Sequence, residues 1–527
     1  MYIIISELKR IYEMNVSFKK IFSVCLVLVL AVLLPACSMH ETKQPDEPKP
    51  SEAATEEDNS ITIGVVELDT YNPLTTKSST TKNMLGFIFE PLFALDSKHN
   101  TSGVLAKSYE TAPDGKSIKV NLKENVIWHD GKLFNAKDVV YTINMIINND
   151  TAYTKTLKNV RAVSENDPYT LTVYFDRSVP NPTMLLSFPV IESGSFEKQS
   201  KPIGTGPFFH DYDRLKAFEA YHGNKPQIEY VKVRSVPDYA KFNSLFNASA
   251  VDVADSSLIK MTEYTPRSNA TVTDFISDEM VFVGFNCSDA VFSNREARKG
   301  VYELIDRKNI VSHIYFSRAA ESFYPMNPDF RFYPSVTGNV RGDQGKAEDT
   351  LKSGGWKKDK AGSYFLPMDN KTIYFGIEIL VSSEDEKRVA VAESISKSMS
   401  EMGMKNTVLK CSESEFYLRV TNGNYDMFIG ETALLPNNDF NELLTGPNMF
   451  NYSDEKTKTL LTQIGTLTVE KDKAEVYNEF FEHFESECPI APICFLKESI
   501  ITSAKIKSGV SPSVAGVVTR TENWSVK

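Results

Sequence analysis

The stretch from residue 114 to residue 146 constrains the fold most, because the spacing of its apolar residues changes from that of a strand to that of a helix within this one segment. Residues 117–122 (SIKVNL) alternate polar and apolar side chains, which predicts a half-buried strand. A second apolar burst at 126–128 predicts another short strand. Between 139 and 147 the apolar residues recur with helical spacing, and Asn135 is a suitable N-cap. The stretch therefore predicts strand, turn, strand and helix, as in a mixed α/β protein.

The first 60 residues have the composition of an export segment. Lys19 and Lys20 precede an unbroken apolar run at 21–34, which ends in Pro35, Ala36 and Cys37. This order predicts a secretory signal, since the run is shorter than the ~20 residues of a membrane span. Residues 38–60 are rich in proline and charge and nearly free of apolar side chains, which predicts a disordered tether.

Charge and cysteine content exclude several classes of protein. The net charge of −11 argues against a nucleic-acid partner. The body carries four cysteines, which are too few for a disulfide framework in so long an exported chain: Cys287, Cys411, Cys488 and Cys494. No Cys-x-x-Cys pair and no His-Glu-x-x-His spacing occurs, so we expect neither a metal site nor a cofactor.

Several motifs together resemble one known family. Residues 128–131 (WHDG) and 135–140 (NAKDVV) resemble the fingerprint of the family 5 extracellular solute-binding proteins, the oligopeptide- and dipeptide-binding lipoproteins of ABC importers. Residues 202–208 (PIGTGPF) and 71–74 (YNPL) are similar to two further turns of that family. The motifs follow the family's order from about residue 61 to residue 524.

The resemblance implies an α/β, two-lobe, periplasmic-binding-protein-like (type II) fold with an extra subdomain in the first lobe. Solute would be held between the lobes, which close around it. The implied segments are a signal peptide with lipobox at 1–37, the tether at 38–60, lobe I at 61–92, 202–292 and 489–527, the extra subdomain at 93–201, and lobe II at 293–488.

The resemblance also implies where a peptide would bind. An extended ligand would pair its main chain with two strand edges. One is the segment after the YNPL turn, and the other follows residues 424–427. The residues concerned are Lys77, Ser78, Ser79, Thr80, Thr81, Glu431, Thr432, Ala433, Leu434, Asn437 and Asp439.

The second of these edges departs from the family pattern. The usual tryptophan position is Glu431, and the aspartate that pairs with a ligand's amino terminus is replaced by Leu434. We therefore expect Glu431 or Asp439 to supply the charge for a cationic or amine-bearing solute. The alternative for Glu431 is a solvated or internally paired residue at the end of a strand.

Location and partners follow from the same resemblance. Residues 34–37 (LPAC) resemble a bacterial lipobox, which predicts diacylation of Cys37 and anchoring at the outer face of the cell membrane. The expected partners are a small solute, most simply a short peptide, and the permease and ATPase subunits of an ABC transporter. We expect a monomer.

Three other functions are open. The solute could be a non-peptide such as a metal chelate, or the protein could be a ligand sensor or adhesin without transport. Catalysis is the third, but residues 115–117 (GKS) lack the glycine and the preceding strand of a phosphate-binding loop. No Gly-x-Ser-x-Gly elbow occurs either, so we expect no enzyme.

Overall fold

The computed structural model describes residues 59–197, 201–258, 269–335 and 342–526. The predicted signal sequence, Cys37 and all but the last two residues of the predicted tether lie outside these ranges. In the part of the chain that is described, no helix is long and apolar enough to span a membrane.

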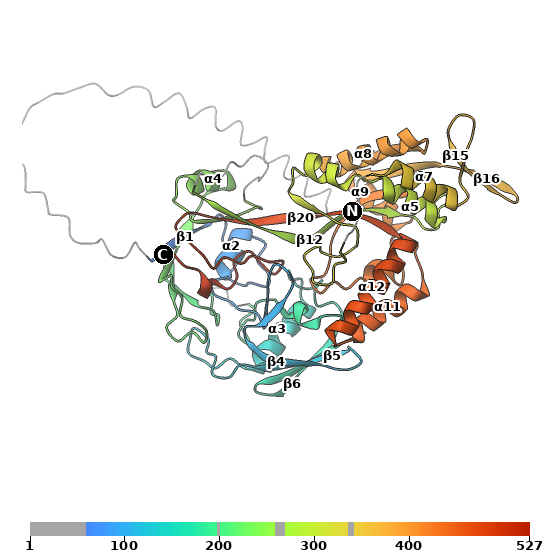
Figure 1. Ribbon diagram of the computed structural model, residues 1–527. Coiled ribbons are helices and arrows are strands. Elements are labelled where there is room, and N and C mark those ends of the chain that lie inside the picture. The colour runs from blue at the N-terminus through green and yellow to red at the C-terminus, as the bar shows by residue number, and fades with distance from the viewer. Residues whose placement is uncertain (1–58, 198–200, 259–268, 336–341, 527) are drawn as a thin grey trace, which may run out of the picture. The chain divides into compact units, whose positions relative to one another are not determined.

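One large sheet runs through the described residues (Figure 1). Its 11 strands follow the order β18-β17-β19-β12-β20-β11-β1-β10-β9-β8, with β13 beside β20. The strands are β1 (Ser60–Val65), β8 (Phe208–Asp211), β9 (Arg214–Ala217), β10 (Tyr230–Ser235), β11 (Val253–Asp255), β12 (Thr271–Phe285), β13 (Ala319–Glu321), β17 (Gly376–Ser382), β18 (Lys405–Cys411), β19 (Met427–Ala433) and β20 (Ile490–Thr502).

Two lobes share this sheet. In lobe I, β1 is parallel to β10 and β11, and α2 (Ser79–Leu85), α4 (Tyr239–Asn247) and η3 (Thr521–Asn523) belong to it. In lobe II, β17 is parallel to β18 and β19. The helices of lobe II are α5 (Arg295–Leu304), α6 (Arg307–Asn309), η2 (Ile310–Ile314), α7 (Gln344–Ser353), α8 (Glu386–Met402), α9 (Glu413–Thr421), α10 (Asn441–Leu444), α11 (Glu455–Thr466) and α12 (Glu470–Glu487).

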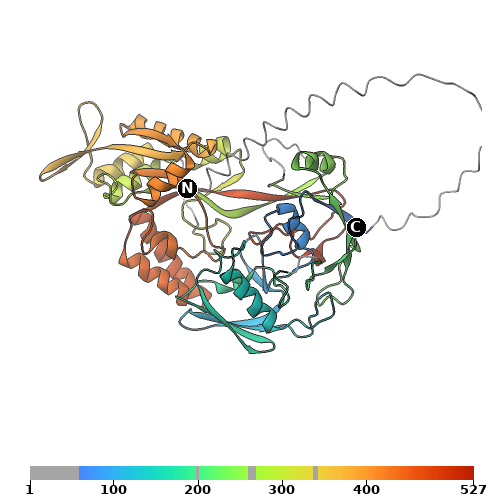
Figure 2. The same ribbon diagram turned by 180° about the vertical axis from the view of Figure 1, so that it is seen from behind.

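The two long strands β12 and β20 cross from one lobe to the other as an antiparallel pair (Figure 2). Residues Thr271–Ile276 pair with Lys497–Thr502 in lobe I, and Met280–Gly284 pair with Ile490–Phe495 in lobe II. The register shifts between Ile276 and Met280, so residues 277–279 form a bulge at the middle of the crossing.

The extra subdomain contains a four-stranded sheet in the order β4-β5-β7-β6 and a two-stranded sheet of β2 and β3. Its apolar side chains, such as Trp128 and Ile143, belong to the same core as Ile61 and Trp524 of lobe I. Its elements are β2 (Phe93–Leu95), β3 (Thr101–Gly103), β4 (Ala106–Thr111), β5 (Ser117–Leu122), α3 (Ala136–Asn148), β6 (Val160–Asp167), β7 (Thr170–Phe175) and η1 (Pro182–Leu186).

The two strongest motifs pack against each other. The predicted strand Ser117–Leu122 and the predicted helix after Asn135 are both confirmed, and Asp138 completes a capping box with Asn135. Between them, the second predicted strand is wrong, because Ile127 makes only an isolated bridge. His129 accepts a hydrogen bond from the backbone of Gly204 and donates one to that of Gly206. Burial lowers the pKa of His129 to about 4, so the ring is neutral and suits this arrangement.

The apolar run at 84–92 predicts a helix from its sequence, but the first helix begins and ends earlier. It spans Ser79–Leu85 and is capped by the Ser78 hydroxyl, which accepts from the Thr81 amide. The carbonyls of Phe87 and Ile88 instead accept from Phe208 and Gly206. The glycine-rich turn around Gly206 therefore occupies the carbonyl groups that a longer helix would have needed for its own hydrogen bonds.

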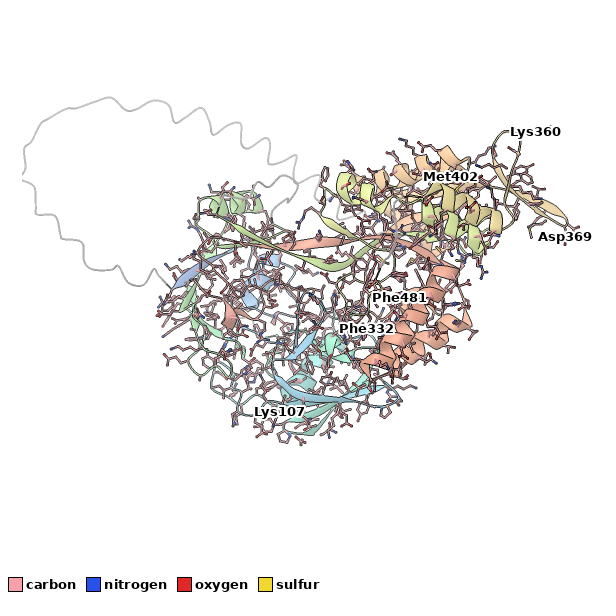
Figure 3. All side chains as sticks on the ribbon, viewed as in Figure 1. Lys107, Phe332, Lys360, Asp369, Met402 and Phe481 are labelled. Atoms are coloured by element: carbon pink, nitrogen blue, oxygen red, sulfur yellow. The ribbon has the colours of Figure 1, made fainter. Side chains whose placement is uncertain are left out.

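Lobe II also carries a small sheet of β14 (Lys357–Lys358), β15 (Tyr364–Met368) and β16 (Lys371–Tyr374). This hairpin projects from the lobe, with Lys360 and Asp369 near its far end (Figure 3).

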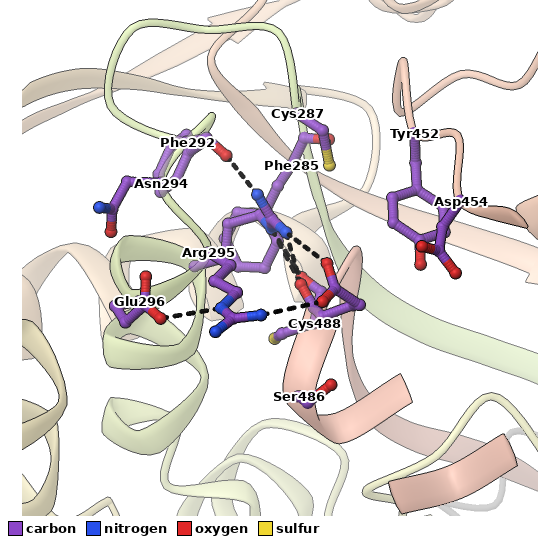
Figure 4. Close-up of polar contacts among 12 residues, drawn as sticks. Phe285, Cys287, Phe292, Asn294, Arg295, Glu296, Tyr452, Asp454, Ser486 and Cys488 are labelled. Atoms are coloured by element: carbon purple, nitrogen blue, oxygen red, sulfur yellow. Dashed lines mark hydrogen bonds and ion pairs between the residues drawn. The ribbon is translucent and has the colours of Figure 1, made fainter. Parts of the chain in front are cut away.

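Arg298 stabilises lobe II at the point where the chain passes from α12 into β20. Its guanidinium donates to the carbonyls of Phe292, Glu487 and Cys488. Arg295 adds hydrogen bonds to Glu296 and Glu487 (Figure 4). These bonds fix the lobe II end of the crossing strand. The four cysteines among the described residues, Cys287, Cys411, Cys488 and Cys494, are free.

Candidate functional site

A cavity of about 250 Å³ lies where lobe I, the extra subdomain, lobe II and the crossing strands meet. We call it the acid cavity. It is lined by Lys82, Ala152, Tyr153, Thr156, Leu185, Ser187, Phe188, Phe275, Ser277, Asp278, Glu279, Ala433, Leu434, Pro436, Glu498, Val514 and Ala515.

Three carboxylates and one ammonium group face this cavity. Asp278 and Glu279 come from the bulge of β12, Glu498 comes from β20, and Lys82 comes from α2. Because three negative charges share a small, partly desolvated space, their mutual repulsion is only partly offset by one lysine. The arrangement attracts a cation.

Asp278 is held firmly by its neighbours. Its Oδ1 accepts from Asn327 at 3.3 Å and lies 3.6 Å from Nε2 of His99. The other ring nitrogen of His99 is 3.2 Å from the Pro436 carbonyl, to which it donates. Burial raises the pKa of Asp278, and His99 opposes that shift. The peptide carbonyl of Asp278 accepts from the Leu434 amide, which ties the bulge to the end of β19.

Glu498 has a different environment. Its side chain is exposed, yet it has lost part of its surrounding water, which raises its pKa. Repulsion from Glu279 adds to the shift. Lys82 opposes the shift and Asp255 reinforces it. A ligand cation placed between Glu279 and Glu498 would relieve this repulsion.

The first predicted strand edge, residues 77–81, is instead the entry to α2. Lys77 is exposed, while Ser78, Thr80 and Thr81 are buried and bonded within the protein. Thr80 accepts from the Val66 amide, and Thr81 donates to the Glu67 carbonyl. Ser79 lines a neighbouring cavity that also contains Lys82 and Glu498. The prediction of a strand edge is wrong here, because Ser78 begins a helix.

The second predicted edge is a strand, β19, as expected from the sequence. Its last residue, Ala433, and the following Leu434 line the acid cavity. Thr432 lies opposite Met280 of β12. Glu431 is exposed and is not among the residues that line the cavity. Loss of water raises the pKa of Glu431, with further contributions from Glu279 and, in the opposite direction, from Arg388.

Asn437 and Asp439 do not face the cavity but join lobe II to the extra subdomain. Asp439 pairs with Arg177 at 2.6 Å, and its side chain is only 1% exposed. Asn437 donates to the Pro180 carbonyl, while its own carbonyl accepts from Asn181. The expectation that Asp439 offers a free carboxylate to a ligand is wrong, because Arg177 already neutralises it.

Sequence reasoning missed Asp278, Glu279, Glu498 and Lys82. One signal was available for the acids. Residues 277–279 (SDE) separate Phe275 and Ile276 from the apolar run at 280–285, and Lys497 and Glu498 interrupt the strand opposite. Polar residues in the middle of two paired central strands indicate either a bulge or a site, and here they mark both.

A family model and two relatives match this chain in sequence. The model for bacterial extracellular solute-binding proteins, family 5 (middle), matches residues 100–456. The oligopeptide-binding protein AppA of Bacillus subtilis is 21% identical over 500 residues, which cover 88% of this chain and 91% of that protein. The nickel-binding periplasmic protein of Escherichia coli is 21% identical over 462 residues, which cover 80% and 86%.

Solved structures support the same fold. HbpA2 from Haemophilus parasuis superposes with a TM-score of 0.74 at 18% identity and covers 89% of this chain and 100% of its own. NikZ from Campylobacter jejuni, in complex with Ni(L-His), gives a TM-score of 0.60 at 20% identity, with 89% and 99% covered. These structures have the two-lobe type II fold that the motifs predict.

Proposed function

Because the chain belongs to the family 5 bacterial extracellular solute-binding proteins, we propose that its acid cavity holds a small amine-bearing solute, a short peptide in the first instance. The family consists of extracellular or periplasmic binding proteins rather than enzymes, and the chain has a solute-binding role for an ABC importer.

The excess of carboxylates in the cavity is the observation that carries the proposal. Asp278, Glu279 and Glu498 face one lysine, Lys82, in the space between the lobes. A protonated amine placed there would pair with carboxylates whose ionised form is otherwise costly. The cavity volume of about 250 Å³ suits a solute of a few residues.

Substitution of the acids tests the assignment. Asp278→Asn, Glu279→Gln and Glu498→Gln should each weaken binding of the tripeptide Ala-Ala-Ala, and the most important of the three by about 2–5 kcal/mol, as measured by calorimetry. Glu431→Gln is the matched control, because Glu431 lies outside the cavity lining. If Glu431→Gln weakened binding and the three cavity variants did not, the amine site would have to be reassigned to Glu431 on β19.

A metal chelate is the second candidate, because one relative is named a nickel-binding periplasmic protein and another was solved in complex with Ni(L-His). In the part of the chain that the structure describes, no three or more His, Cys, Asp or Glu side chains are placed so that they could hold a metal ion. A chelate that brings its own ligands would not need one. Mass spectrometry and metal analysis of the solute that co-purifies with the protein separate the two candidates. A metal-free anionic or sugar-like solute would contradict both.

Delivery and anchoring complete the proposal. Cys37 would carry a diacylglycerol anchor, and residues 38–60 would tether a monomeric body near its permease. Metabolic labelling with a radioactive fatty acid should mark the wild type and not Cys37→Ser. Equal labelling of both proteins would refute the anchor. Permease and ATPase genes beside this one would favour transport over a sensor.

A further inference from the structure

A second cavity adjoins the acid cavity and has a different character. It has a volume of about 100 Å³ and lies between α2, β2 and residues 515–522. The two cavities share Lys82, Tyr153, Ser187 and Ala515 in their linings. We call the second one the apolar pocket, because its remaining wall is formed largely by Leu85, Phe89, Pro91, Ala94, Val104 and Val518.

The two carboxylates of the apolar pocket are already paired. Glu90 accepts from Thr205 at 3.0 Å, from Tyr221 at 2.6 Å and from His222 at 2.8 Å. Glu522 is paired with Arg520 at 2.6 Å. Since these carboxylates have their partners within the protein, the surface that remains for a ligand is largely apolar apart from Lys82.

Tyr153 stands at the junction of the two cavities. Its ring centroid lies 6.1 Å from that of Phe188, and the residue lines both cavities. Burial raises the pKa of Tyr153, so the hydroxyl keeps its proton and can donate. A solute that extends from one cavity into the other would pass this donor.

We propose that the apolar pocket receives a hydrophobic side chain of the solute whose amine lies in the acid cavity. The inference rests on the proposed function and adds the second recognition element, so the preferred peptide combines a free amine with a leucine-sized group. The four shared residues place the two spaces next to each other. A cavity of about 150 Å³ lined by aliphatic side chains holds benzene, so about 100 Å³ suits an aliphatic group.

Three tripeptides of equal backbone test the pocket by calorimetry: Ala-Ala-Ala, Ala-Leu-Ala and Ala-Glu-Ala, together with Leu-Ala-Ala and Ala-Ala-Leu to vary the position. Transfer of the extra carbon atoms of leucine into the pocket should raise affinity at least about tenfold over alanine at one position. Glutamate at that position should gain nothing over alanine.

Two variants fill the pocket. Ala94→Leu adds carbon atoms from β2, and Gly516→Ala adds a methyl group whose nearest neighbour is 3.5 Å away, so the second change is mild enough to keep the fold. Both should reduce the leucine preference, by about tenfold for Ala94→Leu and less for Gly516→Ala. Ala162→Leu is the control, because Ala162 is exposed on β6 and lines neither cavity, so it should leave the leucine-to-alanine ratio unchanged.

The outcomes separate the inference from the function. Equal affinity for the leucine and alanine peptides in the wild type, or a preference that survives Ala94→Leu and Gly516→Ala, would overturn the apolar pocket and leave the amine site standing. If no peptide binds, n-hexylamine and ethylamine are compared in the same way, and the absence of a chain-length preference overturns the inference. A leucine preference with no loss in the three acid variants would overturn the amine site and keep the pocket.

Discussion

At the scale of single residues, the protein concentrates unfavourable charge where its solute is proposed to bind. Asp278 and Glu498 both have raised pKa values because they lose water, and Glu279 adds repulsion to Glu498. Such carboxylates lower the stability of the solute-free protein, and a bound cation would remove this penalty. The same destabilisation therefore favours a cationic solute over a neutral or anionic one.

Glu498→Gln should stabilise the solute-free protein near neutral pH. The folded pKa of Glu498 lies above its ordinary value of 4.5, so its ionised form costs stability at pH 7.5, and the cost disappears as the pH falls below 4.5. We expect the variant to melt about 1–3 °C higher at pH 7.5 and at the same temperature as the wild type near pH 4.

The matched control for this measurement is Glu110→Gln, which removes an exposed carboxylate on β4. It should leave the melting temperature within error at both pH values. A melting temperature of Glu498→Gln below that of the wild type at pH 7.5 would show that the carboxylate is stabilising and would remove this argument for a cation site.

Residue roles were harder to predict than residue environments. The sequence pointed to acids near the end of β19, and acids do gather there, but they come from β12 and β20. Asp439 looked free because its partner, Arg177, is 262 positions away in the chain. Pairing across so large a separation is set by tertiary structure, and no local pattern announces it.

At the scale of elements, the loop after β19 is held by the extra subdomain. Arg177 binds Asp439, Lys158 pairs with Glu442, and Lys155 donates to the Ala433 carbonyl at 2.8 Å. Because Ala433 and Leu434 line the acid cavity, these contacts position one wall of the site.

The ion pair between Arg177 and Asp439 should respond unequally to removal of its two partners. The Asp439 side chain is 1% exposed and that of Arg177 is 29% exposed. Arg177→Met leaves a buried carboxylate without a cation and should cost about 2–4 kcal/mol of stability in urea unfolding. Asp439→Asn leaves an arginine that can reach water and should cost about 1 kcal/mol.

Arg177→Lys is the conservative comparison and should recover part of the loss, since it restores the charge without the guanidinium geometry. The reverse order of the two losses, with Asp439→Asn the larger, would mean that the arginine is the buried partner and that solvent reaches Asp439.

Elements with complete local signals were predictable. The strand Ser117–Leu122 has a strict period, and α3 has both a cap and an apolar face, so each formed as expected. The helix near residue 84 was misplaced because its end is decided by Gly206 and Phe208, which take the carbonyls of Ile88 and Phe87. The bulge at 277–279 likewise needs its partner strand to be recognised.

At the scale of the whole molecule, lobe II meets the extra subdomain through a buried lysine. Lys473 of α12 donates to Asn181 at 3.3 Å. Burial lowers the pKa of Lys473 to about 8, and repulsion from Arg331 adds to the shift. The contact therefore lowers stability to the extent that it removes water from the charged ammonium group of Lys473.

Stability should rise with pH because of Lys473. Below pH 8 the lysine is charged in both the folded and unfolded chain, and the full cost is present. Between about pH 8 and its ordinary pKa of 10.5, the folded chain loses the proton first, and the cost diminishes. Lys473→Met should therefore gain about 1–3 kcal/mol at pH 7.5 and progressively less toward pH 10.

Thermal melting of Lys473→Met and wild type at pH 7.5, 9 and 10 provides the measurement. Lys471→Met, two residues away and exposed on the same helix, is the control and should show no such trend. A constant difference between Lys473→Met and wild type across this range would contradict a depressed pKa at Lys473.

The bulge of β12 has a consequence for anyone who wishes to turn this protein into a sensor. Asp278 and Glu279 are both part of the proposed recognition site and part of the strand pair that connects the lobes. Substitution at these two positions alters the connecting strand pair as well as the recognition site, so we expect the baseline of a fluorescent readout of lobe movement to shift with such variants. Changes in the apolar pocket, which lies off the crossing strands, are the route by which selectivity can be altered while the signal is kept.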